Sequence, residues 1–333
     1  MRALTIFIIA IFLLWGGYWF VASSAVEKGL TNWLDDRANG RWQVQYASLN
    51  TRGFPNRFDT TVTDPSLSNR RAGIVWSAPF WQVFALSYKP NQIIAVWPNQ
   101  QSVALPDQQI DVTSQNIRAS VTFEPGTALT LNRSSFVLED LALLSTQGWR
   151  MQIKSGRLAT RQTVGRENTH DIFFQATQLQ PPAALLSQLD PAGRLSSIID
   201  VAEIDGTLVF DAPWDRFSLE RETPLITAIE LKKMRITWGD MDLQASGSID
   251  VDRAGELAGN IDVTATNWRR MLALATANGG VKPGITQTIA NALELLAQLG
   301  GDGEVLSAPL SFQDGLVKFG PIPLGRAPRL ARR

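Results

Sequence analysis

The sequence begins with a run of twenty uncharged and mostly apolar residues, from Ala3 to Ala22. As an α-helix this run would be about 30 Å long, which matches the hydrocarbon core of a bilayer. Arg2 and the α-amino group precede the run, whereas Glu27 and Lys28 follow it and cancel. The excess of positive charge on the N-terminal side predicts that the N-terminus is cytoplasmic and that the rest of the chain lies across the membrane.

Two interpretations of this segment stay open. As a retained transmembrane anchor, it would carry an interfacial belt of aromatic residues at its outer end: Trp15, Tyr18, Trp19 and Phe20. As a signal peptide, it would be cleaved after Ala25, because residues 23–25 are small. The length of the apolar run and the bulky residues before the cleavage site favour the anchor. In a bacterial cell, this anchor would make the chain a single-pass protein of the inner membrane, with its C-terminal body in the periplasm.

Composition excludes several kinds of site. The 333 residues include no cysteine and one histidine, His170, which excludes zinc–thiolate, iron–sulfur and multi-histidine metal sites. The tail 326–333 holds four arginines and no acid, and without these four the 31 basic residues become 27 against 31 acidic ones. A body with this balance has no electrostatic footprint for nucleic acid. His170 lies in a polar stretch that predicts a surface loop.

Motifs of catalysis are missing from the sequence. It contains no phosphate-binding glycine loop, no nucleophile elbow and no zinc-binding helix motif. The adjacent acids Asp35-Asp36 and Glu139-Asp140 make poor acid–base pairs, because neighbouring side chains point in different directions. We therefore expect no catalytic residues, no cofactor and no metal.

After Gly40 the sequence alternates apolar and polar residues with a period of two, which is typical of antiparallel strands that face a core on one side. Phe58-Thr60-Val62 is one such run, and turn signals such as Asp64-Pro65 separate the runs at short intervals. Apolar residues at helical spacing occur in residues 26–38, directly after the anchor. The same spacing recurs in three later segments, 181–189, 267–277 and 283–299. The predicted fold is α+β and mainly antiparallel β, a curved elongated sheet with a few helices, preceded by one N-terminal transmembrane helix.

We divide the chain into an anchor or signal peptide, a juxtamembrane amphipathic helix, a first β-rich half, a second β-rich half with helices, and a basic tail. Their bounds are 1–25, 26–40, 41–190, 191–325 and 326–333. Residues 155–161 and 246–252 have similar patterns about 90 residues apart, and each leads through a strand into a helix. An internal duplication and a chance likeness of two β-meanders both account for this.

Aromatic residues are densest between residues 76 and 97. The predicted helices are too few to cover a long sheet, and large apolar patches are rarely left open on a monomer. We therefore predict a groove for a hydrophobic ligand, bounded by this region and by the two later helices. Its predicted lining is Trp76, Phe80, Trp81, Phe84, Trp97, Trp268, Leu272, Ile289 and Leu293. An ordinary packed sheet core is the alternative interpretation of the same residues.

Four short motifs resemble an uncharacterised family of single-span bacterial envelope proteins, which is known only as a domain of unknown function. The motifs are Gly53–Phe58, Trp76–Phe80, Tyr88–Asn91 and Trp97-Pro98. This resemblance implies a membrane-anchored protein and supplies no catalytic residues. The segment Asp314–Gly325 loosely resembles the closing hairpin of AsmA-like proteins. This second resemblance implies one N-terminal helix and long β-sheets with apolar grooves that are linked to lipid handling.

These observations predict a membrane-anchored envelope protein of non-enzymatic type that binds or helps to transfer a hydrophobic ligand such as lipid. The expected partners are the membrane, lipid and other envelope proteins, and not nucleic acid. The first alternative is a scaffold for interactions between envelope proteins. The second, a hydrolase, is disfavoured because no catalytic motif was found.

Overall fold

The computed structural model describes residues 2–38, 42–191, 193–218, 223–277, 286–300 and 302–330. Most of these residues form antiparallel strands, and four α-helices accompany them, which confirms the predicted α+β class. The chain divides into two compact units. Unit 1 comprises Met1–Pro125 and Ser134–Gly148, and unit 2 comprises Gly126–Arg133 and Trp149–Arg333. The sequence-based division near residue 190 differs from this one, because strands continue on both sides of Trp149 with no change in composition.

Unit 1 begins with one continuous helix, α1 (Arg2–Ala38), of 37 residues and about 55 Å. The anchor and the juxtamembrane helix, which were predicted as separate segments, are therefore one element, since no proline interrupts them. Residues Arg2–Asp35 are long and apolar enough to cross a membrane, by length and composition. The large apolar side chains from Leu4 to Leu14 are between 50% and 75% exposed, as lipid-facing side chains would be.

The sheet of unit 1 is a meander whose long strands are interrupted part-way. Its segments are β1 (Trp42–Gln45), β2 (Ser48–Arg52), β3 (Arg57–Thr63), β4 (Ser66–Asn69), β5 (Ile74–Ser77), β6 (Phe80–Leu86), β7 (Lys89–Trp97), β8 (Gln100–Ala104), β9 (Gln109–Thr113), β10 (Asn116–Phe123) and β11 (Leu131–Ser145). One antiparallel ladder runs β2–β3–β6–β7–β10. A second runs β1–β4–β5–β8–β9–β11.

The interruptions lie beside one another and are bonded to one another. Asp64 N donates to Pro79 O (3.0 Å), and Ala78 N donates to Pro65 O (3.2 Å). Proline has no N–H to give to a ladder, so Pro65 and Pro79 end the regular pairing at this level. Asp64 also has a positive φ of 49°, which turns the strand. Each long strand of the meander therefore bends at the same level.

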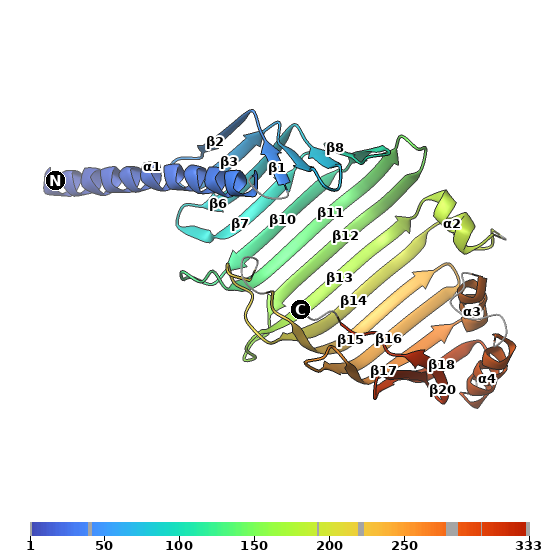
Figure 1. Ribbon diagram of the computed structural model, residues 1–333. Helices are drawn as coiled ribbons and strands as arrows, with labels where there is room; N and C mark the ends of the chain where they lie inside the picture. The colour runs from blue at the N-terminus through green and yellow to red at the C-terminus, as the bar shows by residue number, and fades with distance from the viewer. Residues whose placement is uncertain are drawn as a thin grey trace. The chain divides into compact units, whose positions relative to one another are not determined.

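Unit 2 is an open, curved meander in which each strand from β13 onward pairs with the one before it (Figure 1). Its strands are β12 (Arg150–Gln162), β13 (Thr169–Gln180), β14 (Ile199–Phe210), β15 (Ile226–Trp238), β16 (Met241–Val251), β17 (Leu257–Thr266), β18 (Val305–Gln313), β19 (Leu316–Phe319) and β20 (Ile322–Arg326). The predicted closing hairpin corresponds to β19 and β20.

Three helices connect strands of unit 2, in the segments where the sequence predicts them. They are α2 (Ala183–Leu189), α3 (Trp268–Ala277) and α4 (Thr286–Leu299). The first residues of the predicted helix 283–299 lie outside the described part of the chain. The order strand, strand, helix occurs in β12–β13–α2 and again in β16–β17–α3, as the predicted repeat requires. A common origin of the two stays a prediction.

The curvature of this sheet has local causes in the sequence. A Cβ on Gly247 would clash with Asn260 O on the next strand, and a Cβ on Gly259 would clash with Ser248 O. Both glycines have positive φ, 148° and 140°, so β16 and β17 approach each other in a way that residues with side chains rarely permit. A β-bulge at Lys232 bends β15 nearby.

Helices α3 and α4 pack against one end of the sheet and form the main apolar core of unit 2. Trp268 is 3% exposed and Ala297 is fully buried, and they contact Ala265, Leu293 and Leu306. Arg269 joins the two helices through a bidentate ion pair with Glu294 (Nη2–Oε1 2.7 Å). The core covers β16–β18 at this end, and the strands before β16 extend beyond it.

Candidate functional site

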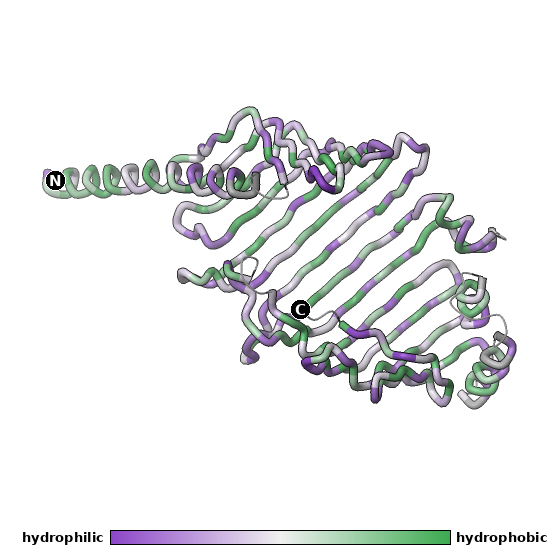
Figure 2. The backbone as a smooth tube through the Cα atoms, viewed as in Figure 1, coloured by the Kyte–Doolittle hydropathy of each residue, from purple (hydrophilic) through white to green (hydrophobic). Residues whose placement is uncertain are grey.

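The sheet of unit 2 has two chemically different faces. Hydrophobic and hydrophilic residues alternate along its long strands (Figure 2), and the registers place the apolar residues of neighbouring strands side by side. We call this side the apolar face, and from β12 to β18 it is formed by Leu158, Ile172, Phe174, Ala176, Ala202, Ile204, Leu208, Ile229, Leu231, Met234, Ile236, Leu243, Ala245, Ile249, Ile261, Val263, Ala265, Leu306, Ala308 and Leu310. None of these positions carries a charge.

The opposite side, the polar face, carries a network of ion pairs. Asp171 on β13 accepts hydrogen bonds from Thr207 (2.9 Å), Arg161 (3.1 Å) and Lys232 (3.1 Å). Partial burial raises the pKa of this carboxyl, but these three partners outweigh it and lower the pKa to about 2. Lys233 pairs with a second carboxylate of this face, on β14. Several carboxylates of the polar face are therefore paired by basic side chains of the same face.

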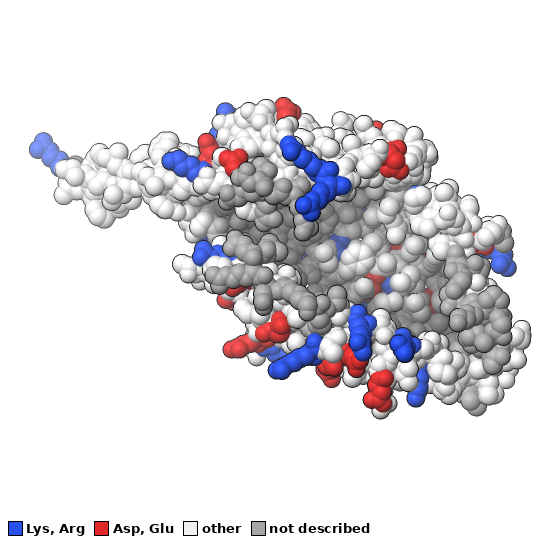
Figure 3. Space-filling view, viewed as in Figure 1, with Lys and Arg blue, Asp and Glu red and all other residues white. Residues whose placement is uncertain are grey.

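The apolar face is covered only in part. Helices α3 and α4 cover its end at Leu243, Ala265 and Leu306. Toward β12 and β13, Leu158 is 53% exposed and Phe174 is 37% exposed. In the view of Figure 3, charged side chains gather along the lower margin of the molecule. The uncovered part of the apolar face is the strongest candidate for a functional surface.

His170 lies at one border of this face, and its predicted place in a surface loop is wrong. It is on β13 and only 4% exposed, because the polar stretch before it turns back into the sheet. Its Nδ1 is 3.3 Å from Thr160 Oγ1, and its ring lies edge-on to Phe210. Burial lowers the pKa of His170, and Asp171 opposes this only in part, so the neutral form is favoured. This environment is typical of a structural histidine.

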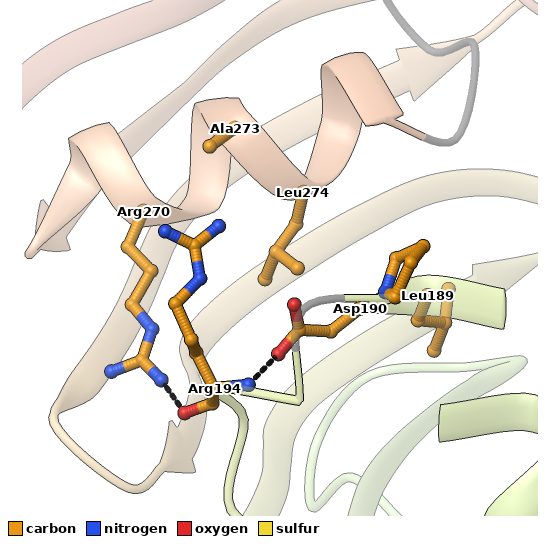
Figure 4. Close-up of a pocket in the computed structure, with 7 residues that line it drawn as sticks. Leu189, Asp190, Arg194, Arg270, Ala273 and Leu274 are labelled. Atoms are coloured by element: carbon orange, nitrogen blue, oxygen red, sulfur yellow. Dashed lines mark hydrogen bonds between the residues drawn. The ribbon is translucent and has the colours of Figure 1, made fainter. Parts of the chain in front are cut away.

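A small cavity lies between the end of α2 and α3 (Figure 4). Its volume is about 160 Å³, and Leu189, Arg194, Arg270 and Leu274 are among its lining residues. The carboxylate of Asp190, 5% exposed, accepts hydrogen bonds from the main-chain N–H groups of Arg194 and Leu195, and Arg270 donates to Arg194 O. Ligand pockets are usually about 300–1,000 Å³. This cavity is a structural junction too small for a lipid.

Groups of metal-binding side chains are not found in the part of the chain that the structure describes. Within those residues, no three His, Asp or Glu side chains are grouped so that they could hold a metal ion. A wider depression of about 390 Å³ follows the row of bends in unit 1, near Asp64, Ser77 and Gln101, and its walls are serine, proline and amide side chains.

The five predicted ligand residues of unit 1 do not share one face of the sheet. Trp81 is opposite Val62 in the ladder, on the side that faces α1, and its ring is 6.3 Å from that of Trp97. Phe80 and Phe84 alternate with Trp81 along β6 and therefore lie on the other side. On β5, Trp76 donates its indole N–H to Gln101 Oε1 (2.9 Å).

The predicted ligand residues of unit 2 belong to the helical core. Trp268 and Leu293 are buried there, and Leu272 packs against them. The side chain of Ile289 lies outside the described part of the chain. These residues belong to a different unit from the aromatic residues of β5–β7. A groove that both sets line together stays a prediction.

A second surface, which sequence reasoning missed, lies where α1 meets the turns of unit 1. Trp15 Nε1 donates to Pro55 O (3.1 Å), Tyr18 OH donates to Ser87 O (2.8 Å) and Trp19 Nε1 donates to Arg57 O (2.9 Å). The aromatic residues that resemble a membrane belt therefore also hold the body. The sequence held one signal of this contact, the apolar side chain of Phe54 in the turn Gly53-Phe54-Pro55. The geometry of the turn accounts for the glycine and the proline but does not require a phenylalanine between them.

The motifs at 53–58, 76–80, 88–91 and 97–98 all lie on strands and turns of unit 1, and the first of them contacts α1 directly. A family model described as "Uncharacterized protein conserved in bacteria (DUF2125)" matches residues 19–328. The chain belongs to this family. No curated protein and no solved structure matches the chain. The family resemblance inferred from the motifs is confirmed, whereas the likeness to AsmA-like proteins stays an expectation.

Proposed function

We propose that this chain is a single-span envelope protein of non-enzymatic type, anchored in the bacterial inner membrane by α1, with its body in the periplasm. The length and apolarity of α1 support the anchor. The charges that flank the uncharged run support the orientation. Membership of a bacterial family is consistent with both. The docking of Trp19 against the body favours retention over cleavage, since a buried side chain would be lost with a signal peptide.

The proposed role of the body is to bind, or to help transfer, a hydrophobic ligand such as lipid on the uncovered part of the apolar face. The observation that carries this proposal is a row of uncharged side chains that continues past the last covering helix, to Phe174 and Leu158. Burying exposed apolar area is favourable by about 25 cal/mol per Å². An acyl chain is one of the few ligands that needs apolar contact along several strands and no specific polar partner.

Two adjacent residues of β13 allow a matched test. Phe174 is on the apolar face and Phe173 is on the polar face, where the guanidinium of Arg157 lies 6.0 Å from its ring. A photo-crosslinking benzoyl-phenylalanine is placed at one or the other position in the full chain, and cells are irradiated. Mass spectrometry of the purified protein should find lipid adducts for position 174 and none for position 173.

The alternative role, a scaffold for other envelope proteins, makes a different forecast for the same experiment. Crosslinks from position 174 to a protein, with no lipid adduct, would support the scaffold and overturn the lipid proposal. Equal lipid labelling at both positions would also count against it, because contact would then not depend on the apolar face. The anchor is unaffected by either result, since it rests on α1.

A further inference from the structure

Two aromatic side chains stand at the tips of turns in unit 1, beside the membrane helix. Phe54, in the turn between β2 and β3, is 43% exposed, and Tyr88, in the turn between β6 and β7, is 58% exposed. The ring of Phe54 packs against three aromatic rings of α1, with centroid distances of 6.3 Å to Phe12, 5.5 Å to Trp19 and 5.8 Å to Phe20. The turn therefore follows the helix toward its N-terminal end.

The position of Phe54 along α1 can be compared with the bilayer boundary. The uncharged run ends at Ala22, and the ring of Phe54 would lie 3.9 Å from a Cβ placed on Gly16. Six residues of helix correspond to about 9 Å. If α1 spans the bilayer with residues 3–22, Phe54 lies about that far inside the outer boundary of the hydrocarbon.

We propose that these two turns form a second membrane contact, in which Phe54 enters the acyl region of the outer leaflet and Tyr88 lies at its headgroup interface. This inference rests on the retained anchor of the proposed function. The two turns lie at a similar level of α1, because Ser87 O accepts from Tyr18 and Ser87 Oγ donates to Pro55 O. We place Tyr88 at the interface because its hydroxyl can reach the headgroups while its ring stays in apolar surroundings. Tyrosine commonly occupies this interface, because its ring is apolar and its hydroxyl is polar.

The hydrogen bonds of the turns support this placement. Backbone groups inside a bilayer need internal partners, because the hydrocarbon offers none. Gly53 O accepts from Arg57 N (2.9 Å), and Asn56 O accepts from Ser87 N (2.9 Å). Pro55 O accepts from both Trp15 Nε1 and Ser87 Oγ. A turn exposed to water does not require such partners for its carbonyls, whereas a turn in lipid does.

Charges around the tips also fit a membrane. Arg52, Arg57 and Lys89 are exposed next to the two turns. The one nearby acid on β3, Asp59, is paired with Arg57 (3.0 Å). Long basic side chains can reach the headgroups while their stems lie along apolar surface, and they are attracted to anionic lipids. The partner that this surface fits is therefore a bilayer with anionic headgroups.

The absence of cysteine from the sequence allows a clean test in the full chain. The variants F54C and Y88C are each labelled with a fluorophore, and the protein is reconstituted into vesicles of phosphatidylethanolamine and phosphatidylglycerol. Nitroxide quenchers are placed on the headgroup, high on the acyl chain or deep in it. L13C, on the exposed side of α1, reports insertion of the anchor. A72C, in the exposed turn between β4 and β5, reports the aqueous side.

The expected result is quenching of position 54 by the nitroxide high on the acyl chain, of position 88 by the headgroup nitroxide, and of position 13 by the deep one. Position 72 should be at least several-fold less quenched than position 54 by every quencher. Quenching at 13 without quenching at 54 and 88 would overturn the second contact and leave the anchor standing. No quenching at 13 would overturn the anchor, and the second contact with it.

Discussion

Trp19 in the membrane helix and Arg57 at the start of β3 are joined by a hydrogen bond of 2.9 Å, from the indole Nε1 to the main-chain oxygen. The Trp19 ring also lies 6.0 Å from that of Phe58, and both side chains are almost completely buried. A residue of the uncharged run is thus part of the core of unit 1. The helix that would hold the protein in a membrane also stabilises its fold.

Replacing Trp19 with alanine should therefore destabilise unit 1. Removal of a buried tryptophan from a core typically costs about 3–5 kcal/mol. We expect W19A to unfold at a clearly lower temperature than the original chain in the same detergent, as measured by circular dichroism. L14A is the matched control, since Leu14 is on the same helix but is 75% exposed. An equal loss of stability in both variants would contradict the docking of α1.

The mature protein should keep its N-terminal segment. Intact-mass measurement of protein purified from membranes should give a chain that includes residues 3–25, because Trp19 and Ser23 are buried against the body. A mature chain that begins at Val26 would show a cleaved signal peptide instead and would remove the anchor from the proposal.

The orientation of the body can be measured separately. A reporter enzyme that is active only after export, fused after Arg333, should be active, and a reporter that is active only in the cytoplasm should be silent. The reason is the positive charge of Arg2 and the amino terminus before the apolar run. The reverse pattern would place the body in the cytoplasm.

The bend between β16 and β17 should not tolerate a side chain. In G247A the new Cβ would clash with Asn260 O, so we expect a loss of about 2–4 kcal/mol in the free energy of unfolding. G126A is the control, because Gly126 has a similar positive φ (147°) but open space around the added Cβ. Urea unfolding of the two variants separates the clash from the cost of the backbone angle. Equal losses would show that the close approach is unimportant.

The polar face should make the fold sensitive to acid. The folded-state pKa of Asp171 is about 2, below its ordinary value of 3.8, so its contribution to stability is complete above pH 4 and is lost as the pH falls from about 4 to about 2. After allowance for solvent screening around this partly exposed cluster, the contribution is about 1 kcal/mol. Chemical unfolding should find D171N less stable than the original chain at pH 6, and the difference should shrink at pH 2.5. A difference independent of pH would contradict this.

The sequence predicted the fold well where a local pattern decides the structure. Period-two alternation identified the strands, and runs at helical spacing identified α2 and α3 to within about two residues. It did not predict that α1 continues from the anchor through Ala38, because a change from apolar to amphipathic character looks like a boundary even when nothing ends the helix.

Prediction of the site was limited by contacts between distant residues. A dense run of aromatic residues on β6 was assigned to one surface, yet adjacent strand residues point to opposite faces, which separates Phe80 and Phe84 from Trp81. The approach of Phe54 to α1 joins residues more than thirty positions apart, and no local pattern reports it. His170 was misplaced for the same reason, since the partners that bury it belong to other strands.

The strand order of unit 2 has a consequence for how the chain reaches its structure. Because each strand from β13 to β20 pairs with its immediate predecessor, the ladder can grow one hairpin at a time, and no strand waits for a distant partner. Contacts between residues close in sequence have a low entropic cost of loop closure and favour rapid folding. Such a sheet can be completed progressively while the chain is still being delivered.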